Sequence, residues 1–305
     1  MRAVAIPEAG ASPALVDVTT PSAGPGEVLV KVRASSVNGF DVAVAAGMLQ
    51  GMMEHRYPVV LGKDFAGTVE GLGEGASRFA PGDEVFGVVM KPYLGDGGWA
   101  EYLVVGDQHA IAATPAGLDA ARAGALGLAG TAALQAVETL GPVSGHKVLV
   151  SGASGGVGAI ALQYALAAGA ELIATARHGA EEELVRKLGA VDVVDYAADL
   201  EEQVHAIAPE GVDAVLHFAG DADRLAGLLA PNGRLVSTVG FGPDQHPSAI
   251  ALMADPDSET LDRLAADVAS GRIVVPITRT YDLSAAPQAV ADFSAGTVGK
   301  SAISV

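Results

Sequence analysis

The chain has 305 residues, a net charge of −18 at pH 7, 50% hydrophobic residues and no cysteine. The acidic balance argues against nucleic acid or any other polyanion as a partner, because such binding depends on cationic side chains that contact phosphate. The lack of cysteine excludes disulfides, thiolate nucleophiles and cysteine-ligated zinc.

The first 118 residues are predicted to form a mainly β domain. Short β-type runs bounded by turn residues lie in residues 3–6, 27–37, 66–73, 83–89 and 99–105. From Asp119 an alanine-rich helical run extends through Leu140, and strands then alternate with helices. These later strands are predicted in residues 147–152, 171–177, 191–196, 212–220 and 233–240. The alternation predicts an α/β fold with a doubly wound parallel sheet.

After Phe241 the sequence predicts a polar loop and four further elements. These are a helix over 259–270, a strand over 272–277, a helix over 285–294 and a strand over 300–305. They are too few to form a domain alone, so we expect them to return to the first one. The expected domains are therefore residues 1–118 with 256–305, and an inserted nucleotide-binding domain of residues 119–255, with the chemistry in the cleft between them.

A glycine-rich turn follows the strand at 147–152. Its glycines, among them Gly155 and Gly158, leave the turn without Cβ atoms, so that a phosphate can approach the N–H groups at the start of the next helix. The G-x-G-x-x-G spacing falls on Ala153, Gly155 and Gly158, with alanine in the first place. The strand, turn, helix and strand are the context of a dinucleotide-binding fingerprint. The alternative is a glycine-rich turn of some other α/β protein.

The end of the next strand indicates which dinucleotide binds. In NAD enzymes an acidic residue there accepts hydrogen bonds from the ribose. Here the strand ends in Arg177, whereas Glu171 opens the strand and lies at its wrong end. A guanidinium would donate to the 2′-phosphate, so the sequence favours NADPH over NADH. The alternative for Arg177 is a solvated surface charge.

Longer segments carry a family resemblance. They read "GEVLVKVRASSVNGFDVAVAAG", "YPVVLGKDFAGTVEGLGEGASRFAPGDEVFG", "GGWAEYLVV", "LAGTAALQAV", "VLVSGASGGVGAIALQYALAAGA" and "SGRIVVP". The chain resembles the zinc-independent medium-chain dehydrogenase/reductases, specifically their quinone oxidoreductase branch. The resemblance implies a GroES-like catalytic domain, a Rossmann domain that binds NADPH, a homodimer and hydride transfer from NADPH to a quinone. A cytoplasmic location is expected separately, because the sequence shows no leader-like or membrane-spanning apolar segment.

The resemblance also concerns zinc. Zinc-dependent relatives have a Cys in the segment matching residues 38–41 and a His in the segment matching residues 62–64, and this chain has neither. Lys63 stands where the His would be, and a protonated lysine is not a ligand. We therefore predict no metal site.

Three residues are expected at the catalytic centre. In the family the residue matching Asn38 lies beside the nicotinamide and the acceptor, and the one matching Thr131 meets the nicotinamide end of the cofactor. Asn38 as a turn cap and Thr131 as a hydrogen bond within its helix are the structural alternatives. Lys63 is expected to point into the cleft and to pair with Asp41 or Asp64, or else to donate to the acceptor carbonyl. The other residues expected to bind the cofactor are Ser154, Gly155, Gly156, Val157, Arg177, Phe218, Ala219, Gly240 and Phe241.

The cofactor would carry most of the chemistry. The acceptor is predicted to be a quinone or, alternatively, an activated alkene such as an enone, an alkenal or an enoyl thioester. A short-chain dehydrogenase is disfavoured because no tyrosine has a lysine four residues later. A binding protein of the same fold without turnover stays open. No apolar run reaches the roughly 18 residues of a spanning helix, so no membrane partner is expected.

Overall fold

The computed structural model describes residues 1–305, which form two compact units. Unit 1 consists of Met1–Leu128, Pro256–Gly271 and Val275–Val305, and unit 2 of Ala129–Asp255 and Arg272–Val274. Segments from both ends of the chain thus build unit 1.

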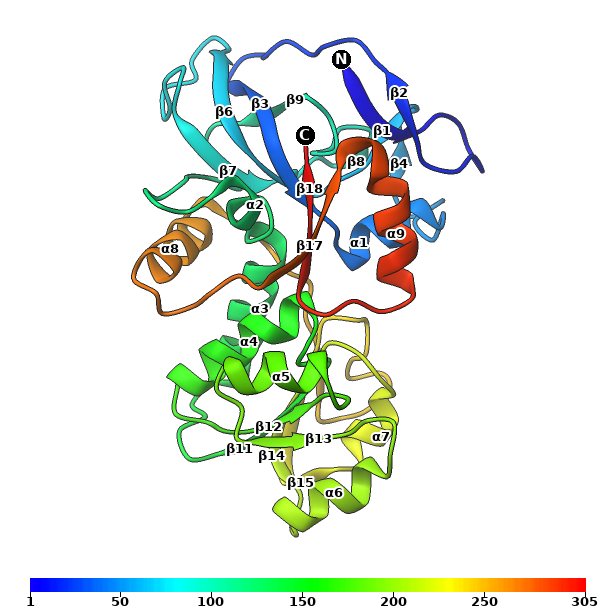
Figure 1. Cartoon of the computed structure of the whole chain (residues 1–305), viewed down its shortest axis with the longest axis vertical. Helices are drawn as coiled ribbons and strands as arrows, with labels where there is room; N and C mark the ends of the chain where they lie inside the picture. Colours follow the sequence, from blue (N-terminus) through cyan, green and yellow to red (C-terminus); the bar gives the residue numbers. More distant parts are fainter. The chain divides into compact units, whose positions relative to one another are not determined.

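Unit 1 is a β-structure with a few helices (Figure 1). Its largest sheet has the order β10-β7-β6-β3-β18-β17, with β9 also paired to β3, and its small sheets are β2-β1-β5 and β4-β8. The strands are β1 (Arg2–Ile6), β2 (Ala14–Asp17), β3 (Glu27–Ser36), β4 (Glu54–His55), β5 (Val59–Val60), β6 (Asp64–Leu72), β7 (Glu84–Val88), β8 (Tyr93–Leu94), β9 (Tyr102–Gly106), β10 (Ile111–Ala113), β17 (Ile277–Asp282) and β18 (Lys300–Ser304).

The helices of unit 1 cover parts of these sheets. Helix α1 packs against α9, α8 packs against β10, and α2 contacts β3, β6 and β18. Residues 119–128, expected in the nucleotide-binding domain, therefore belong to unit 1. The helical segments are α1 (Gly39–Ala45), α2 (Ala120–Ala123), α8 (Ser258–Ala269), the 3₁₀ turn η1 (Leu283–Ala285) and α9 (Ala286–Ser294).

Unit 2 is a parallel sheet with helices between its strands, which confirms the predicted fold class. The sheet order is β13-β12-β11-β14-β15-β16, so the order reverses between β11 and β14 as in doubly wound nucleotide-binding folds. The elements are α3 (Gly127–Leu140, which begins in unit 1), β11 (Lys147–Ser151), α4 (Gly156–Ala167), β12 (Glu171–Thr175), α5 (Ala180–Lys187), β13 (Asp192–Val194), α6 (Leu200–Ile207), β14 (Val212–His217), α7 (Ala222–Ala226), β15 (Leu229–Ser237) and β16 (Ala249–Ala251).

The structure differs from the predicted elements at several points, and the short strands β2, β4, β5, β8, β10 and β16 were not predicted. The strand expected over 272–277 lies over Ile277–Asp282, because Pro276 has no N–H with which to join a sheet. The helical run expected through Leu140 is broken at Gly124 into α2 and α3, and α1 was not predicted. No helix combines the length and the apolar character needed to cross a bilayer.

Candidate functional site

A buried polar cluster lies where β3, β6 and β18 meet in unit 1. We call it the Asn38 cluster, and it consists of Ser36, Asn38, Asp41, Asp64 and Lys300, all of them buried. Strand β3 pairs with both β6 and β18, which brings its last residues beside the first residues of its two neighbours. Pairing within one sheet thus brings together side chains that are up to 264 positions apart in the sequence.

Asp64 is the central acceptor of the cluster. Its Oδ2 accepts hydrogen bonds from Ser36 Oγ at 2.6 Å and from Asn38 Nδ2 at 2.8 Å, and it lies 3.7 Å from Lys300 Nζ. Its Oδ1 accepts from the backbone N–H of Leu128 at 2.8 Å, in the first turn of α3. A fully buried carboxylate is stable only with such partners, and here both oxygens have them.

The amide of Asn38 is fixed in one orientation. Lys300 Nζ donates to Asn38 Oδ1 at 2.7 Å and to the carbonyl oxygen of Val37 at 3.2 Å. Because an ammonium only donates and a carboxylate only accepts, the Asn38 oxygen must face Lys300 and its nitrogen must face Asp64. Burial lowers the pKa of Lys300, while the charges of Asp64 and Asp41 raise it.

Asp41 supports the turn that carries Asn38. Its carboxyl oxygens accept from the backbone N–H groups of Asn38 and Lys63, each at 2.9 Å. Burial raises the pKa of Asp41 to about 7, with a further rise from the charge of Asp64, against the two N–H donors and Lys300. Asp41 thus ties the turn before α1 to the segment before β6.

The prediction that Lys63 pairs with Asp41 or Asp64 is wrong, because the lysine that pairs with Asp64 is Lys300. The Lys63 ammonium donates to the carbonyl oxygen of Val89 at 2.5 Å and lies 4.8 Å from the centre of the Phe40 ring. Only its backbone N–H contacts Asp41. The lysine that reaches Asp64 is Lys300, from the other end of the chain. Burial lowers the pKa of Lys63.

In unit 2, the glycine-rich turn joins β11 to α4. Gly155 is the N-terminal cap of α4, so the N–H groups of the first helical turn are oriented for an anion. A Cβ at Gly158 would lie 2.1 Å from the carbonyl oxygen of Gly152, so only glycine lets α4 pack on the turn. A Cβ at Gly155 would approach only that same oxygen, at 3.3 Å. The space in front of Gly155 therefore fits the close approach of a pyrophosphate.

The other predicted cofactor residues of unit 2 follow neighbouring strands. Because the strands are parallel, their carboxyl ends share one edge of the sheet. The Ser151 hydroxyl donates to Ala219 and the Thr175 hydroxyl accepts from Gly152, which ties the turn to the neighbouring strands. The turn and the start of α4 contain Ser154, Gly156 and Val157. The segments after β14 and β15 contain Phe218 and Ala219, and Gly240 and Phe241, respectively. Thr131 lies apart from these residues in α3 and is fully buried.

Arg177 lies just after β12, as predicted, but its side chain already has an anionic partner. Its Nε and Nη2 donate to Glu181 Oε1 at 2.9 and 2.6 Å, and its backbone N–H donates to Glu181 Oε2 at 3.0 Å. Tyr196 also donates to Glu181 Oε1, at 3.2 Å. The hydrogen bonds from Arg177 lower the pKa of Glu181 although burial alone would raise it.

The sequence reasoning did not identify two residues that contact predicted site residues: Glu181, which pairs with Arg177, and Lys300, which donates to Asn38. Glu181 stands only four positions after Arg177, which precedes α5, so the pair forms across the start of that helix and its only sequence signal is this short separation. Lys300 carries a weaker signal, as the one charged residue in an otherwise uncharged terminal strand. No local pattern links it to Asp64.

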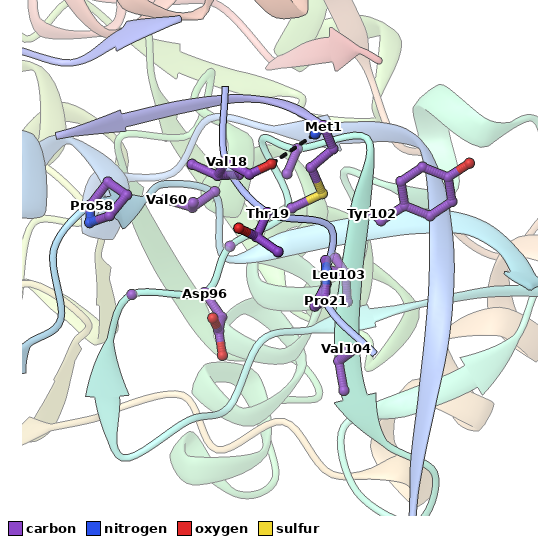
Figure 2. A pocket seen from close by; sticks show the side chains of 13 residues that line it. Met1, Val18, Thr19, Pro21, Pro58, Val60, Asp96, Tyr102, Leu103 and Val104 are labelled. Atoms are coloured by element: carbon purple, nitrogen blue, oxygen red, sulfur yellow. Dashed lines mark hydrogen bonds between the residues drawn. The ribbon is translucent and has the colours of Figure 1, made fainter. Parts of the chain in front are cut away.

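A separate pocket of about 180 Å³ lies in unit 1 and contains none of the predicted site residues (Figure 2). Val18, Pro58, Val60 and Leu103 give it apolar walls, and its one acidic side chain, Asp96, accepts from the hydroxyl of Tyr93. The structure contains no group of three or more His, Asp or Glu side chains arranged to bind a metal.

Two family models match the chain. Residues 24–116 match the alcohol dehydrogenase GroES-like domain, and residues 156–257 match the zinc-binding dehydrogenase family. The chain is 31% identical over 295 residues to a chloroplast envelope quinone oxidoreductase homolog of Arabidopsis thaliana, a match that covers 90% of this chain and 88% of that protein.

A second relative is much longer than this chain. It is a mycocerosic acid synthase-like polyketide synthase of Mycobacterium tuberculosis, 40% identical over 218 residues, which are 70% of this chain and 10% of the synthase. The chain thus matches about a tenth of that relative's length.

Solved structures resemble the whole chain. The quinone oxidoreductase from Coxiella burnetii has a TM-score of 0.88 at 27% identity, with 100% of this chain and 99% of that chain covered. An NAD-dependent alcohol dehydrogenase has a TM-score of 0.90 at 26% identity, and mycobacterial Rv1454c in complex with NADPH has 0.85 at 26%, both with 100% of each chain covered. The predicted resemblance is confirmed: the chain belongs to the medium-chain dehydrogenase/reductase superfamily, in its quinone oxidoreductase branch.

Proposed function

We propose that this chain transfers hydride from NADPH to a quinone without a metal ion. Membership of the family makes it an oxidoreductase that uses a pyridine nucleotide. The observation that carries the proposal is the glycine-rich turn, where Gly155 leaves room for a phosphate at the start of α4. The likeness to quinone oxidoreductases supports the choice of acceptor.

The residues of the glycine-rich turn and Arg177 fit the phosphate groups of NADPH. The N–H groups at the start of α4 would bind the pyrophosphate, and Arg177 would meet the 2′-phosphate of NADPH. Of the five N–H groups of a guanidinium, two are bonded to Glu181, which leaves three. Those three support the preference for NADPH.

The chain's own part in the reaction is to bind, to orient and to exclude water. Bound NADPH would supply the hydride. We assign Asn38 to the acceptor site because Lys300 and Asp64 hold its amide in one orientation, and a fixed polar group orients a carbonyl better than a mobile one. The proton needed to complete a hydroquinone would come from solvent.

Independence from zinc is also part of the proposal. It is supported by Lys63 at the position of the ligand His, and by the lack of any group of metal-ligating side chains. Activity should therefore persist after prolonged incubation with a chelator, and added zinc should not raise it.

Reduction of an activated alkene is the second candidate. It uses the same hydride transfer, and one observation favours it. The match to the mycocerosic acid synthase-like polyketide synthase has a higher identity, 40%, than the match to the plant quinone oxidoreductase homolog, 31%.

The experiment is a steady-state assay of NADPH oxidation with a panel of quinones and a matched panel of enones and alkenals. The proposal expects higher kcat/KM values for quinones. Higher values for the alkenes would favour the second candidate. No oxidation with either panel would leave a cofactor-binding protein without turnover.

A further inference from the structure

The acidic residue that pairs with Arg177, the predicted 2′-phosphate donor, is Glu181, in the first turn of α5. Its side chain is only 10% exposed, whereas the Arg177 side chain is 58% exposed. It accepts three hydrogen bonds from Arg177, two from the guanidinium and one from the backbone, and a fourth from Tyr196. These hydrogen bonds and its low exposure hold the Glu181 side chain in one position beside the carboxyl end of β12.

The same arrangement changes what Arg177 can offer to a phosphate. An isolated guanidinium would bring a full positive charge to the 2′-phosphate, but an arginine paired with a carboxylate at 2.6 Å brings a nearly neutral pair. The phosphate, with a charge near −2, would also meet the Glu181 carboxylate itself. Two negative groups placed close together repel each other and therefore weaken the binding of the phosphate.

Glu181 does not resemble the acid that selects NADH. Such an acid must offer oxygen lone pairs to the ribose hydroxyls. Both Glu181 oxygens instead accept from neighbouring groups, Oε1 from the guanidinium and the Tyr196 hydroxyl, and Oε2 from the Arg177 backbone. Its effect would therefore fall on the phosphorylated cofactor alone.

We propose that Glu181 is a specificity-determining residue that restrains the preference for NADPH by pairing with Arg177. The inference rests on the proposed use of Arg177 as the 2′-phosphate donor. It implies that the unaltered chain favours NADPH only modestly, and that removing one carboxylate charge sharpens the preference.

The test is the variant Glu181→Gln, with dissociation constants for NADPH and NADH measured by titration without an acceptor. Glutamine can still accept from the guanidinium but carries no charge, so NADPH should bind about tenfold more tightly. NADH should change by less than about twofold, because it has no phosphate at this position. The quantity to compare is the ratio of the two constants.

The matched control is Glu182→Gln, one position along the same helix. The Glu182 side chain also forms ion pairs, with His178 and Arg186, and only the Glu182 backbone contacts Arg177, where its N–H donates to the carbonyl oxygen at 3.1 Å. The control should leave the ratio unchanged. An equal gain in both variants would show that only the general acidity of α5 matters and would overturn the assignment.

Three further results would overturn the inference. The first is an unchanged ratio of the two dissociation constants. The second is an equal loss of affinity for both cofactors, which would identify Glu181 as a structural residue. The third is a loss of affinity for NADH alone, which would identify Glu181 as a ligand of the ribose. If Glu181→Gln fails to fold, Glu181→Ala provides the same comparison, because it removes the charge without placing an amide against the Arg177 N–H. Failure of the unaltered chain to bind either cofactor would instead refute the proposed function.

Discussion

The Asn38 cluster and the carboxyl edge of the unit 2 sheet are built in opposite ways. The cluster consists of buried side chains from distant parts of the sequence, and each polar group has a partner within the protein. The edge consists of loops, and its key groups are backbone N–H groups and one half-exposed arginine. Substitutions in the Asn38 cluster should therefore lower both the stability of the fold and the activity. Substitutions at the carboxyl edge of the unit 2 sheet should alter cofactor binding alone.

The largest expected effects come from two glycines of the same turn. Valine at Gly158 would bring its Cβ within 2.1 Å of the Gly152 carbonyl oxygen, so α4 could not pack and unit 2 should lose its cooperative unfolding transition. Circular dichroism on heating measures this. A normal transition in Gly158→Val would show that the turn can shift, against the close packing described here.

Gly155→Val should separate binding from folding. The backbone at Gly155 has φ −78°, which any residue can adopt, and its Cβ would meet only the Gly152 carbonyl oxygen, at 3.3 Å, a contact that a shift of a few tenths of an ångström relieves. The added methyl groups would occupy the phosphate position, so NADPH and NADH should both bind about 100-fold more weakly or worse. Retained NADPH affinity in a folded variant would show that the phosphates bind elsewhere.

Lys300→Met should test the buried region. The variant leaves Asp64 without its ion pair and Asn38 Oδ1 without its donor, so we expect a loss of about 3 kcal/mol or more in the free energy of unfolding, measured with denaturant. The kcat for quinone reduction should also fall, since the Asn38 amide is released.

Lys63→Met is the matched control for Lys300→Met. Lys63 donates to one carbonyl oxygen, so its loss should cost about 1 kcal/mol, with kcat/KM nearly unchanged. A loss of about 100-fold in both kcat and kcat/KM would instead identify Lys63 as a donor to the acceptor carbonyl.

Arg177→Ala should have a smaller effect, confined to one cofactor. We expect NADPH to bind about tenfold more weakly and NADH to be nearly unchanged, with the melting temperature preserved. Arg186→Ala is a suitable control, because that guanidinium pairs with Glu182 and the carbonyl oxygen of Val191. Equal losses for both cofactors in Arg177→Ala would contradict a contact with the 2′-phosphate.

A separate effect is expected on the pH dependence of stability. Because the pKa of Asp41 is raised from 3.8 to about 7, the folded chain retains a proton that the unfolded chain releases in this window. The contribution of Asp41 to the free energy of unfolding therefore decreases as pH rises, by at most about 1.4 kcal/mol per pH unit. Asp41→Asn should remove this contribution. Parallel profiles for the two proteins would contradict the raised pKa.

The two regions also differ in how far the sequence predicts them. The glycine turn and the parallel sheet depend on local patterns, so the β11–α4–β12 segment was predicted together with the position of Arg177. The pair between Arg177 and Glu181 was also local but was overlooked. The Asn38 cluster depends on the pairing of β3 with β6 and β18, which no spacing in the sequence encodes. For this reason the pairing role was assigned to Lys63 instead of Lys300.

The most direct test of the account is a single-turnover measurement of NADPH oxidation by chelator-treated protein. It compares NADPH that carries hydrogen with NADPH that carries deuterium at the transferred position of nicotinamide C4. The account predicts oxidation that requires a quinone and is slower with the deuterated cofactor, because the C4 hydride is transferred in the rate-limiting step. Oxidation only with an alkene, or no acceptor-dependent oxidation, would contradict it.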